Sequence, residues 1–262
     1  MKEAVDELKR IINDKTSGSV DLSIRVFSFI RRNPNIRYAE VISEAFVGMA
    51  LVRNAAKLAL NDASMSPEDF RDTVINQERL SIANAVKFID AEAITTMSNS
   101  HNVLEFIRSS DNVKRVYVLE SRPMLEGRIM AAEISSFGKE VYMTTDAEMC
   151  LAVAMSDAVV VGSDSVLSDL TLIHKVGTLP LALCAAHEDR PLYSLTMSLK
   201  FESEYCMSDY PAFKSHECSD LGIDRNCINV YFEKTPSDYI SMFFSDSGPI
   251  RGGRSNRSAT PR

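Results

Sequence analysis

Apolar residues recur every three to four positions through the first ninety residues, which is the pattern of amphipathic helices. We therefore predict a helical N-terminal domain over residues 1–90. Helix signals such as Ser66-Pro67, with proline at the first helical position, divide this stretch into four parts. The predicted helices span residues 4–12, 21–32 (capped by Asp21), 41–60 and 67–89 (with Ile75 facing inward).

From residue 91 the pattern changes to short apolar runs that alternate with helical stretches. Such alternation is typical of βαβ units, and right-handed crossovers then produce a doubly wound sheet. We predict an α/β fold in which a Rossmann-like, mainly parallel sheet domain occupies residues 91–250. Predicted strands cover 93–97, 115–119, 140–143, 158–161 and 192–197, and predicted helices cover 103–109, 125–137, 147–155 and 175–187.

The last sixty residues give weaker signals. The polar run 203–226 predicts a long irregular loop, and a short helix is expected over 237–243. The tail 251–262 holds four arginines and no core residue, so we expect it to be disordered. Its Arg251-Gly252-Gly253-Arg254 segment resembles RNA-contacting repeats, but a single copy is more simply a solvated terminus.

Composition narrows the class of protein. The 262 residues are 45% hydrophobic and 25% charged, the balance of a globular protein, and the net charge of −7 argues against binding nucleic acid over the whole surface. No apolar run reaches about 18 residues, and the N-terminus lacks a signal-peptide core, so we expect a soluble cytoplasmic protein without membrane contact. The five cysteines lack zinc-site spacing and are interpreted as reduced thiols; no metal or cofactor is expected.

Polar clusters follow four of the predicted elements, at residues 98–102, 120–123, 162–165 and 198–200. The carboxyl ends of parallel strands meet at one edge of a sheet, and ligands of doubly wound folds bind there. Each cluster alone is more often a turn or a helix cap, with Ser98 and Asp164 the clearest cases. The hypothesis of a binding site depends on their convergence.

Each cluster has a chemical role to offer. The amide and hydroxyl groups of Ser98–Asn102 could hold a phosphate at a helix start, and Arg122 could clamp the same anion. The Asp164 carboxylate could accept a sugar hydroxyl or move a proton. His174-Lys175 is expected at the start of a helix, and Lys200 adds a further positive charge.

Three stretches carry a resemblance to a known family. Residues 118–128, 162–169 and 174–178 resemble the initiation factor 2B family, which groups the alpha, beta and delta regulatory subunits of translation initiation factor 2B with two sugar-phosphate isomerases. Lys15–Ser19 looks like the family's N-terminal phosphate-contact turn, and Asn229–Pro236 like its closing strand. The resemblance implies a helical domain on a Rossmann-like domain, a homodimer or higher homo-oligomer, and a translation factor as a partner.

The resemblance also implies roles for individual residues. The isomerases pair a catalytic aspartate with a cysteine, and the matching positions here are Asp164 and Ser98. The contacts to a phosphorylated sugar or nucleotide would fall on Ser17, Gly18, Ser100, His101, Asn102, Arg122, His174, Lys175 and Lys200.

The serine at the cysteine position bears on the choice between a regulatory protein and an isomerase. A thiol with a pKa near 8.5 exchanges a proton close to neutral pH, a hydroxyl does not, and losing a general acid–base group costs about 10²–10⁴ in rate. Ser98 therefore favours a regulatory protein with a sugar-phosphate or nucleotide pocket and without normal isomerase activity. The alternative is an isomerase of the ribose-1,5-bisphosphate or methylthioribose-1-phosphate type, in which His101 or His174 replaces the thiol beside Asp164.

Overall fold

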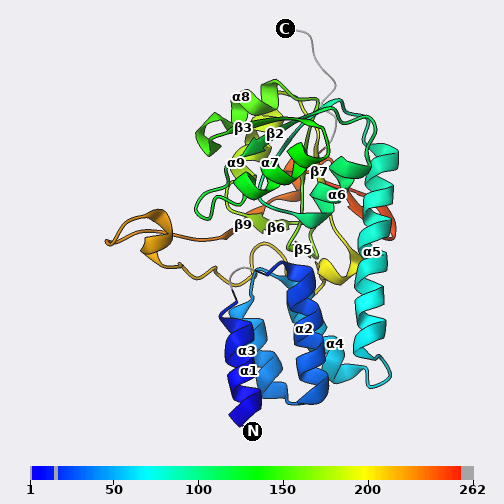
Figure 1. Ribbon diagram of the computed structural model, residues 1–262, viewed down its shortest axis with the longest axis vertical. Coiled ribbons are helices and arrows are strands. Elements are labelled where there is room, and N and C mark those ends of the chain that lie inside the picture. The colour runs from blue at the N-terminus through cyan, green and yellow to red at the C-terminus, as the bar shows by residue number, and fades with distance from the viewer. Residues whose placement is uncertain (1, 15–16, 255–262) are drawn as a thin grey trace.

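The computed structural model describes residues 2–14 and 17–254. Four helices form one end of the molecule, a sheet flanked by helices forms the other, and a long helix runs beside both (Figure 1). Within the described ranges, no helix is both long enough and apolar enough to cross a membrane. The first five helices are α1 (Lys2–Ile12), α2 (Ser19–Arg32), α3 (Ile36–Ala45), α4 (Ala50–Asn61) and α5 (Pro67–Phe88).

Two expectations about the early helices are wrong. Helix α2 is capped by Gly18, and Asp21 lies in its first turn, where a negative charge is favourable. The single helix expected over 41–60 is two helices, α3 and α4, separated by a turn. In that turn the backbone of Gly48 lies against the Phe232 ring. A Cβ added at Gly48 would lie 2.5 Å from a ring atom, so the position requires glycine.

Helix α5 begins with a capping box between Ser66 and Asp69, as the Ser-Pro signal predicts. Ile75, which was expected to face inward, is 44% exposed. The buried residues of α5 are Phe70, Val74, Glu78, Ser81 and Ala85. A carboxylate therefore lies in the buried face of this helix, next to the sheet.

The main sheet has seven strands in the order β11-β10-β7-β4-β1-β2-β3, with β11 antiparallel at one edge. Counted in chain order, its six parallel strands follow the 3-2-1-4-5-6 arrangement of dinucleotide-binding folds, so the predicted doubly wound sheet is confirmed. The chain order reverses between β1 and β4. The strands are β1 (Ala93–Thr96), β2 (Arg115–Leu119), β3 (Glu140–Thr144), β4 (Ala158–Val161), β7 (Leu192–Leu195), β10 (Met242–Ser245) and β11 (Gly248–Arg251), and the helices are α6 (His101–Ser109), α7 (Gly127–Ser136), α8 (Met149–Ala154) and α9 (Thr178–His187).

A second, four-stranded sheet lies between the main sheet and the N-terminal helices (Figure 1). It corrects the expectation of a helix from Lys175, because His174 and Lys175 belong to a strand and the helix begins at Thr178. This strand is β6, and all four of its residues are buried. Its sequence therefore lacks the alternation of apolar and polar residues that marks a half-exposed strand. The strand order is β8-β5-β6-β9, with β5 (Ser165–Leu167), β6 (Leu172–Lys175), β8 (Phe201–Glu202) and β9 (Phe232–Thr235).

The C-terminal part also differs from expectation. Instead of a helix over 237–243, a 3-10 turn, η4 (Ser237–Tyr239), leads into β10, which pairs in parallel with β7. The expected disorder of the tail is wrong as far as Arg254, whose guanidinium donates to the Arg190 carbonyl. The rest of the tail, 255–262, lies outside the described residues.

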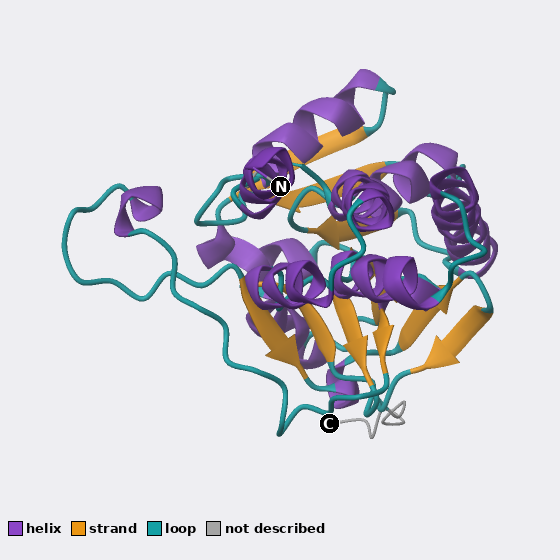
Figure 2. Cartoon of the chain, turned by 90° about the horizontal axis from the view of Figure 1, so that it is seen from below, coloured by secondary structure: helices purple, strands orange, loops and turns teal. Residues whose placement is uncertain are grey.

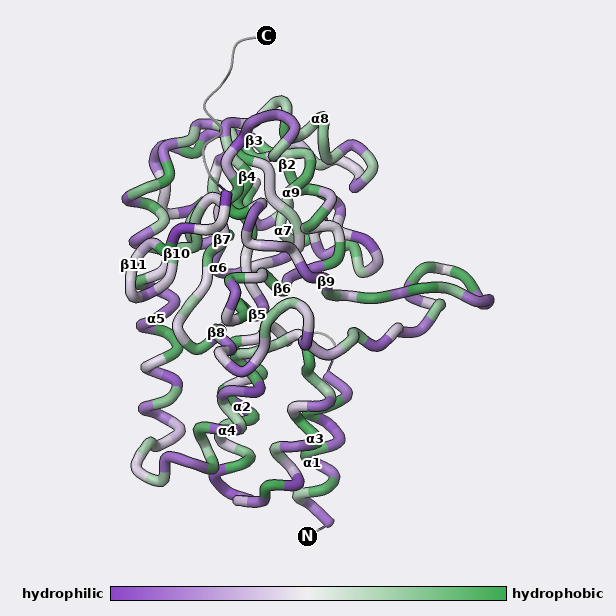
Figure 3. Tube along the Cα trace, turned by 180° about the vertical axis from the view of Figure 1, so that it is seen from behind, coloured by the Kyte–Doolittle hydropathy of each residue, from purple (hydrophilic) through white to green (hydrophobic). Residues whose placement is uncertain are grey.

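The segment between β8 and β9 projects from the body and contains the 3-10 turn η3 (Cys218–Leu221) (Figures 1 and 2). Apolar and polar stretches alternate along it (Figure 3). Its irregular character confirms the predicted loop.

The expectation of reduced thiols is wrong. Cys218 and Cys227 form a disulfide across the projecting segment, and Cys150 and Cys184 form another that joins α8 to α9. Packing of α8 against α9 brings the second pair of Cα atoms to 4.9 Å despite a separation of 34 residues, which spacing in the sequence does not reveal. Cys206 is free.

Candidate functional site

A cavity of about 400 Å³ opens where the carboxyl ends of β1 and β4 meet the N-terminal helices. This is the point at which the strand order of the sheet reverses, where doubly wound folds bind ligands. Nine of the eleven residues predicted for the site line the cavity. The full lining is Ser17, Gly18, Ser19, Val20, Asp21, Met49, Glu78, Ser98, Asn99, Ser100, His101, Asn102, Ser163, Asp164, His174 and Lys200.

Ser98 follows β1 in a left-handed backbone conformation, with φ of 64°. Its amide donates a 2.7 Å hydrogen bond to the hydroxyl of Ser121, which follows the neighbouring strand β2. Ser121 is itself left-handed, and its amide donates to the Asp146 carboxylate at 2.9 Å. Non-glycine residues adopt this conformation only where their surroundings enforce it, so a chain of contacts from Asp146 fixes the Ser98 backbone at the cavity.

Gly162 allows two parts of the site to approach each other. A Cβ at this position would lie 2.5 Å from Ser100 Oγ and 3.4 Å from His174 Nε2. The turn after β4 therefore passes directly under the start of α6 and beside β6. A side chain at this position would displace Ser100, so glycine is the residue that leaves the Ser100 side chain in place.

Asp164 lines the cavity, and two elements distant in sequence hold its backbone. Its amide donates to the Ile173 carbonyl at 2.9 Å, and its carbonyl accepts from the Ala50 amide at 3.1 Å, so β6 and the start of α4 hold its backbone. Burial raises the pKa of its carboxyl to about 6, against the opposing charges of Lys200 and Lys175. Near neutral pH such a carboxyl can both give and take a proton, as a general acid or base must.

His174 is a neutral hydrogen-bond acceptor. The Thr178 hydroxyl donates to the Lys175 carbonyl at 2.6 Å, so its oxygen accepts from His174 Nδ1 at 2.9 Å. This assigns the proton to Nδ1 and leaves a lone pair on Nε2. Burial, helped by the charges of Lys200 and Lys175, lowers the pKa of His174 to about 3.

Lys200 is the one ammonium group among the described lining residues. It is buried, and its Nζ donates a 2.6 Å hydrogen bond to the Ser163 carbonyl. Burial lowers the pKa of Lys200, while the charges of Asp164 and Glu78 oppose that shift. The Lys200 ammonium therefore interacts electrostatically with two carboxylates, Asp164 after β4 and Glu78 on α5.

Glu78 is a lining residue that sequence reasoning missed. It reaches the cavity from α5, is 8% exposed, and has no hydrogen-bond partner for Oε1, while Oε2 lies 3.8 Å from His101 Nε2. Burial raises the pKa of its carboxyl. A signal existed in the sequence, because Glu78 occupies a position of the stripe that includes Phe70 and Val74.

Two predicted site residues do not line the cavity. The Lys175 ammonium lies 2.5 Å from the Glu126 carboxylate and 5.5 Å from the centre of the Tyr231 ring. The Arg122 guanidinium donates to the Leu221 carbonyl of the projecting segment at 3.2 Å. Both cations are engaged with other parts of the chain.

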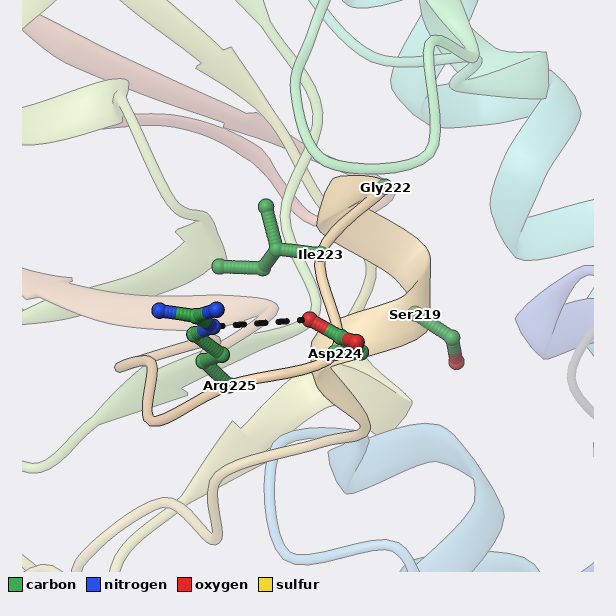
Figure 4. Close-up of a pocket in the computed structure, with 5 residues that line it drawn as sticks. All are labelled: Ser219, Gly222, Ile223, Asp224 and Arg225. Atoms are coloured by element: carbon green, nitrogen blue, oxygen red, sulfur yellow. Dashed lines mark ion pairs between the residues drawn. The ribbon is translucent and has the colours of Figure 1, made fainter.

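Another hollow lies on the projecting segment (Figure 4). Its Asp224 and Arg225 side chains form an ion pair at 4.0 Å but are 98% and 92% exposed. A fully solvated pair of this kind contributes little binding energy. None of the residues that line this hollow belongs to the predicted site.

Helices packed on a doubly wound sheet define a Rossmann-like protein, and its polar cavity lies at the switch point, where folds of this class bind ligands. Residues 35–252 match the model of the Initiation factor 2 subunit family, and the chain belongs to that family. Its membership confirms the family resemblance of the sequence.

Known relatives include both enzymes and factors. The chain is 25% identical over 218 residues to a ribose 1,5-bisphosphate isomerase of Archaeoglobus fulgidus, covering 75% of this chain and 70% of that protein. It is 32% identical over 172 residues to a putative translation initiation factor eIF-2B subunit 2-like protein of Pyrococcus horikoshii, covering 62% of this chain and 58% of the relative. The solved structure of a Pyrococcus horikoshii OT3 translation initiation factor eIF-2B has the same fold, with a TM-score of 0.80 at 21% identity over 96% of this chain and 98% of that one.

Proposed function

We propose that this protein is a regulatory, ligand-binding member of its family, and that the cavity binds a phosphorylated sugar or nucleotide without ordinary isomerase turnover. The observation that carries the proposal is Ser98. It lies at the end of β1, in the position where the resemblance places the isomerases' cysteine, and among the described lining residues there is no cysteine. Eight of the other ten predicted site residues line the same cavity.

The phosphate end of the ligand has a candidate position. The N-termini of α2 and α6 both border the cavity, and neither N-cap residue, Gly18 or Ser100, caps its helix with a side chain. Free backbone amides at a helix N-terminus attract anions, and the buried Lys200 ammonium adds a full positive charge.

Isothermal titration of ribose 5-phosphate and adenosine monophosphate into the purified protein tests this proposal. At least one compound should bind, and Lys200→Met should weaken that binding at least about tenfold, since charge-assisted hydrogen bonds are worth about 1.5–3 kcal/mol. Lys214→Met, which removes an exposed lysine from the projecting segment, should bind as the wild type does. Equal affinities of all three proteins would place the ligand outside the cavity.

A second candidate function is a working aldose–ketose isomerase, as the name of the Archaeoglobus fulgidus relative suggests. The observation that favours it is the Asp164 carboxyl, whose pKa of about 6 suits proton transfer. His174, with a pKa of about 3, is a poor replacement for a thiol, which leaves His101 as the partner. Under this candidate, Asp164→Asn should remove turnover of ribose 1,5-bisphosphate; unchanged turnover would exclude the mechanism.

The partners of the chain belong to the same proposal. Assembly into a homodimer or larger oligomer, and contact with a translation factor, are expected from the family and from the names of the Pyrococcus horikoshii relatives. Sedimentation velocity of the purified protein would measure the oligomer directly. A monomer at micromolar concentration would contradict the expected self-association.

A further inference from the structure

The Glu78 side chain presents an unused acceptor to the cavity. Its Oε1 atom is buried and has no hydrogen-bond partner among the described residues, although its other oxygen lies near His101. An unsatisfied buried carboxylate oxygen is costly, so native proteins keep one mainly where something else supplies the donor.

Asn102, at the start of α6, presents the complementary group. It is 4% exposed, lines the same cavity, and its Nδ2 donor also lacks a partner in the described chain. A hydroxyl is the group that can donate to a carboxylate and accept from an amide at once. The unpaired acceptor of Glu78 and the unpaired donor of Asn102 together form a suitable subsite for ligand hydroxyls.

The charges around the cavity restrict the other end of the ligand. Among the described lining residues, Asp21, Glu78 and Asp164 carry carboxylates, whereas Lys200 alone carries an ammonium, and His174 is neutral. The cations that could have balanced a second phosphate are committed elsewhere, because Lys175 pairs with Glu126 and the Arg122 side chain contacts the projecting segment.

We infer that Glu78 is a specificity-determining residue: it accepts a hydrogen bond from a ligand hydroxyl, and its charge excludes a second phosphate. The ligand class is then a polyhydroxy compound with a single phosphate, such as a pentose monophosphate, in preference to a bisphosphate. This inference rests on the proposed function, because it concerns the same cavity. It places ligand hydroxyls at the unpaired Glu78 and Asn102 atoms.

The test compares two ligands on three proteins. Titration calorimetry should show that the wild type binds ribose 5-phosphate more tightly than ribose 1,5-bisphosphate, by on the order of tenfold, because like charges repel each other in a partly buried site. Glu78→Gln, which keeps the shape and removes the charge, should abolish most of that preference. Asp72→Asn, which removes an exposed charge from the same helix, should keep it.

The outcomes separate this inference from the proposed function. If the bisphosphate binds the wild type as tightly as the monophosphate, or if Glu78→Gln keeps the full preference, the role of Glu78 is overturned while the cavity remains a binding site. If neither sugar phosphate binds, and inorganic phosphate does not bind either, both the inference and the proposed function are overturned. Melting temperatures of the variants verify that each one is folded.

Discussion

The Nδ1 atom of His174 donates to the hydroxyl of Thr178 at 2.9 Å, and this contact fixes which nitrogen of the ring faces the cavity. The threonine is fixed in turn, because its own proton goes to the Lys175 carbonyl. A histidine held in this way, buried and near two ammonium groups, stays neutral. Its lone pair on Nε2 can accept a hydrogen bond from a ligand hydroxyl, but the ring cannot act as an acid near neutral pH.

The neutral His174 predicts a pH dependence of stability. Its pKa falls from 6.5 in the unfolded chain to about 3 in the fold, so the unfolded state takes up a proton between these values and stability is lost as the pH drops below 6.5. The loss from pH 7 to pH 5 should be about 2 kcal/mol. Urea unfolding of wild type and His174→Asn at both pH values measures it. The variant should lose less stability than the wild type, and equal losses would contradict a neutral buried ring.

The buried Asp164 carboxyl predicts that stability changes with pH in the opposite direction. Its pKa rises from 3.8 to about 6, so the folded state holds the extra proton and stability falls as the pH rises from about 4 to above 6. At pH 7.5, Asp164→Asn should therefore be more stable than the wild type, by up to about 3 kcal/mol. The gain should shrink toward pH 4. Because His174 and Asp164 act in opposite directions, the difference between variant and wild type is the quantity to follow, and a variant less stable at pH 7.5 would refute the assignment.

Gly162 predicts a steric effect on the site. In Gly162→Ala the new methyl group would lie 2.5 Å from Ser100 Oγ and 2.9 Å from Ser100 Cβ, which forces the start of α6 to shift. Overpacking of this kind costs about 1–3 kcal/mol. Thermal unfolding should show the loss, and Ser100→Gly in the same chain should restore most of it by removing the obstructing atoms. A Gly162→Ala protein as stable as the wild type would mean that the turn after β4 does not pass so close to α6.

The disulfide between Cys150 and Cys184 predicts a stabilising cross-link. Closing a loop with a separation of 34 residues should contribute about 3–4 kcal/mol by restricting the unfolded chain. The double variant Cys150→Ser/Cys184→Ser should lose about that amount in chemical unfolding under non-reducing conditions. Cys206→Ser, which removes the free thiol, is the matched control and should leave stability unchanged. Equal stability of the double variant and the wild type would show that the cross-link is absent in solution.

The sequence predicts the fold well where apolar periodicity is clean. Strands such as Ala158–Val161 and Arg115–Leu119 are bounded as predicted, because a buried parallel strand is a short apolar run between turn signals. β6 escapes this reasoning, since it buries His174 and Lys175 along with apolar residues. The helix expected at 237–243 fails because β10 depends on pairing with β7, a contact distant in sequence.

The candidate site follows the same division. Residues after β1, β4 and β7 converge because a parallel sheet aligns its strand ends, which sequence can anticipate. Glu78 joins them from a helix that packs against the sheet, and the distance between these elements along the chain hides that contact. Lys175 and Arg122 were predicted to line the site but do not, for a similar reason. Their partners, Glu126 and Leu221, are brought to them by the tertiary structure.

The central proposal is that the cavity binds a ligand without ordinary turnover, because Ser98 stands where the resemblance places the cysteine of the isomerases. The most direct measurement is the rate at which the purified protein converts ribose 1,5-bisphosphate or methylthioribose 1-phosphate to its ketose product, followed by phosphorus NMR. We predict a rate at least about 10² below ordinary enzymatic turnover of 1–10³ s⁻¹ for both compounds, since a general acid–base group is missing. Conversion of either sugar phosphate at an ordinary enzymatic rate would contradict the account.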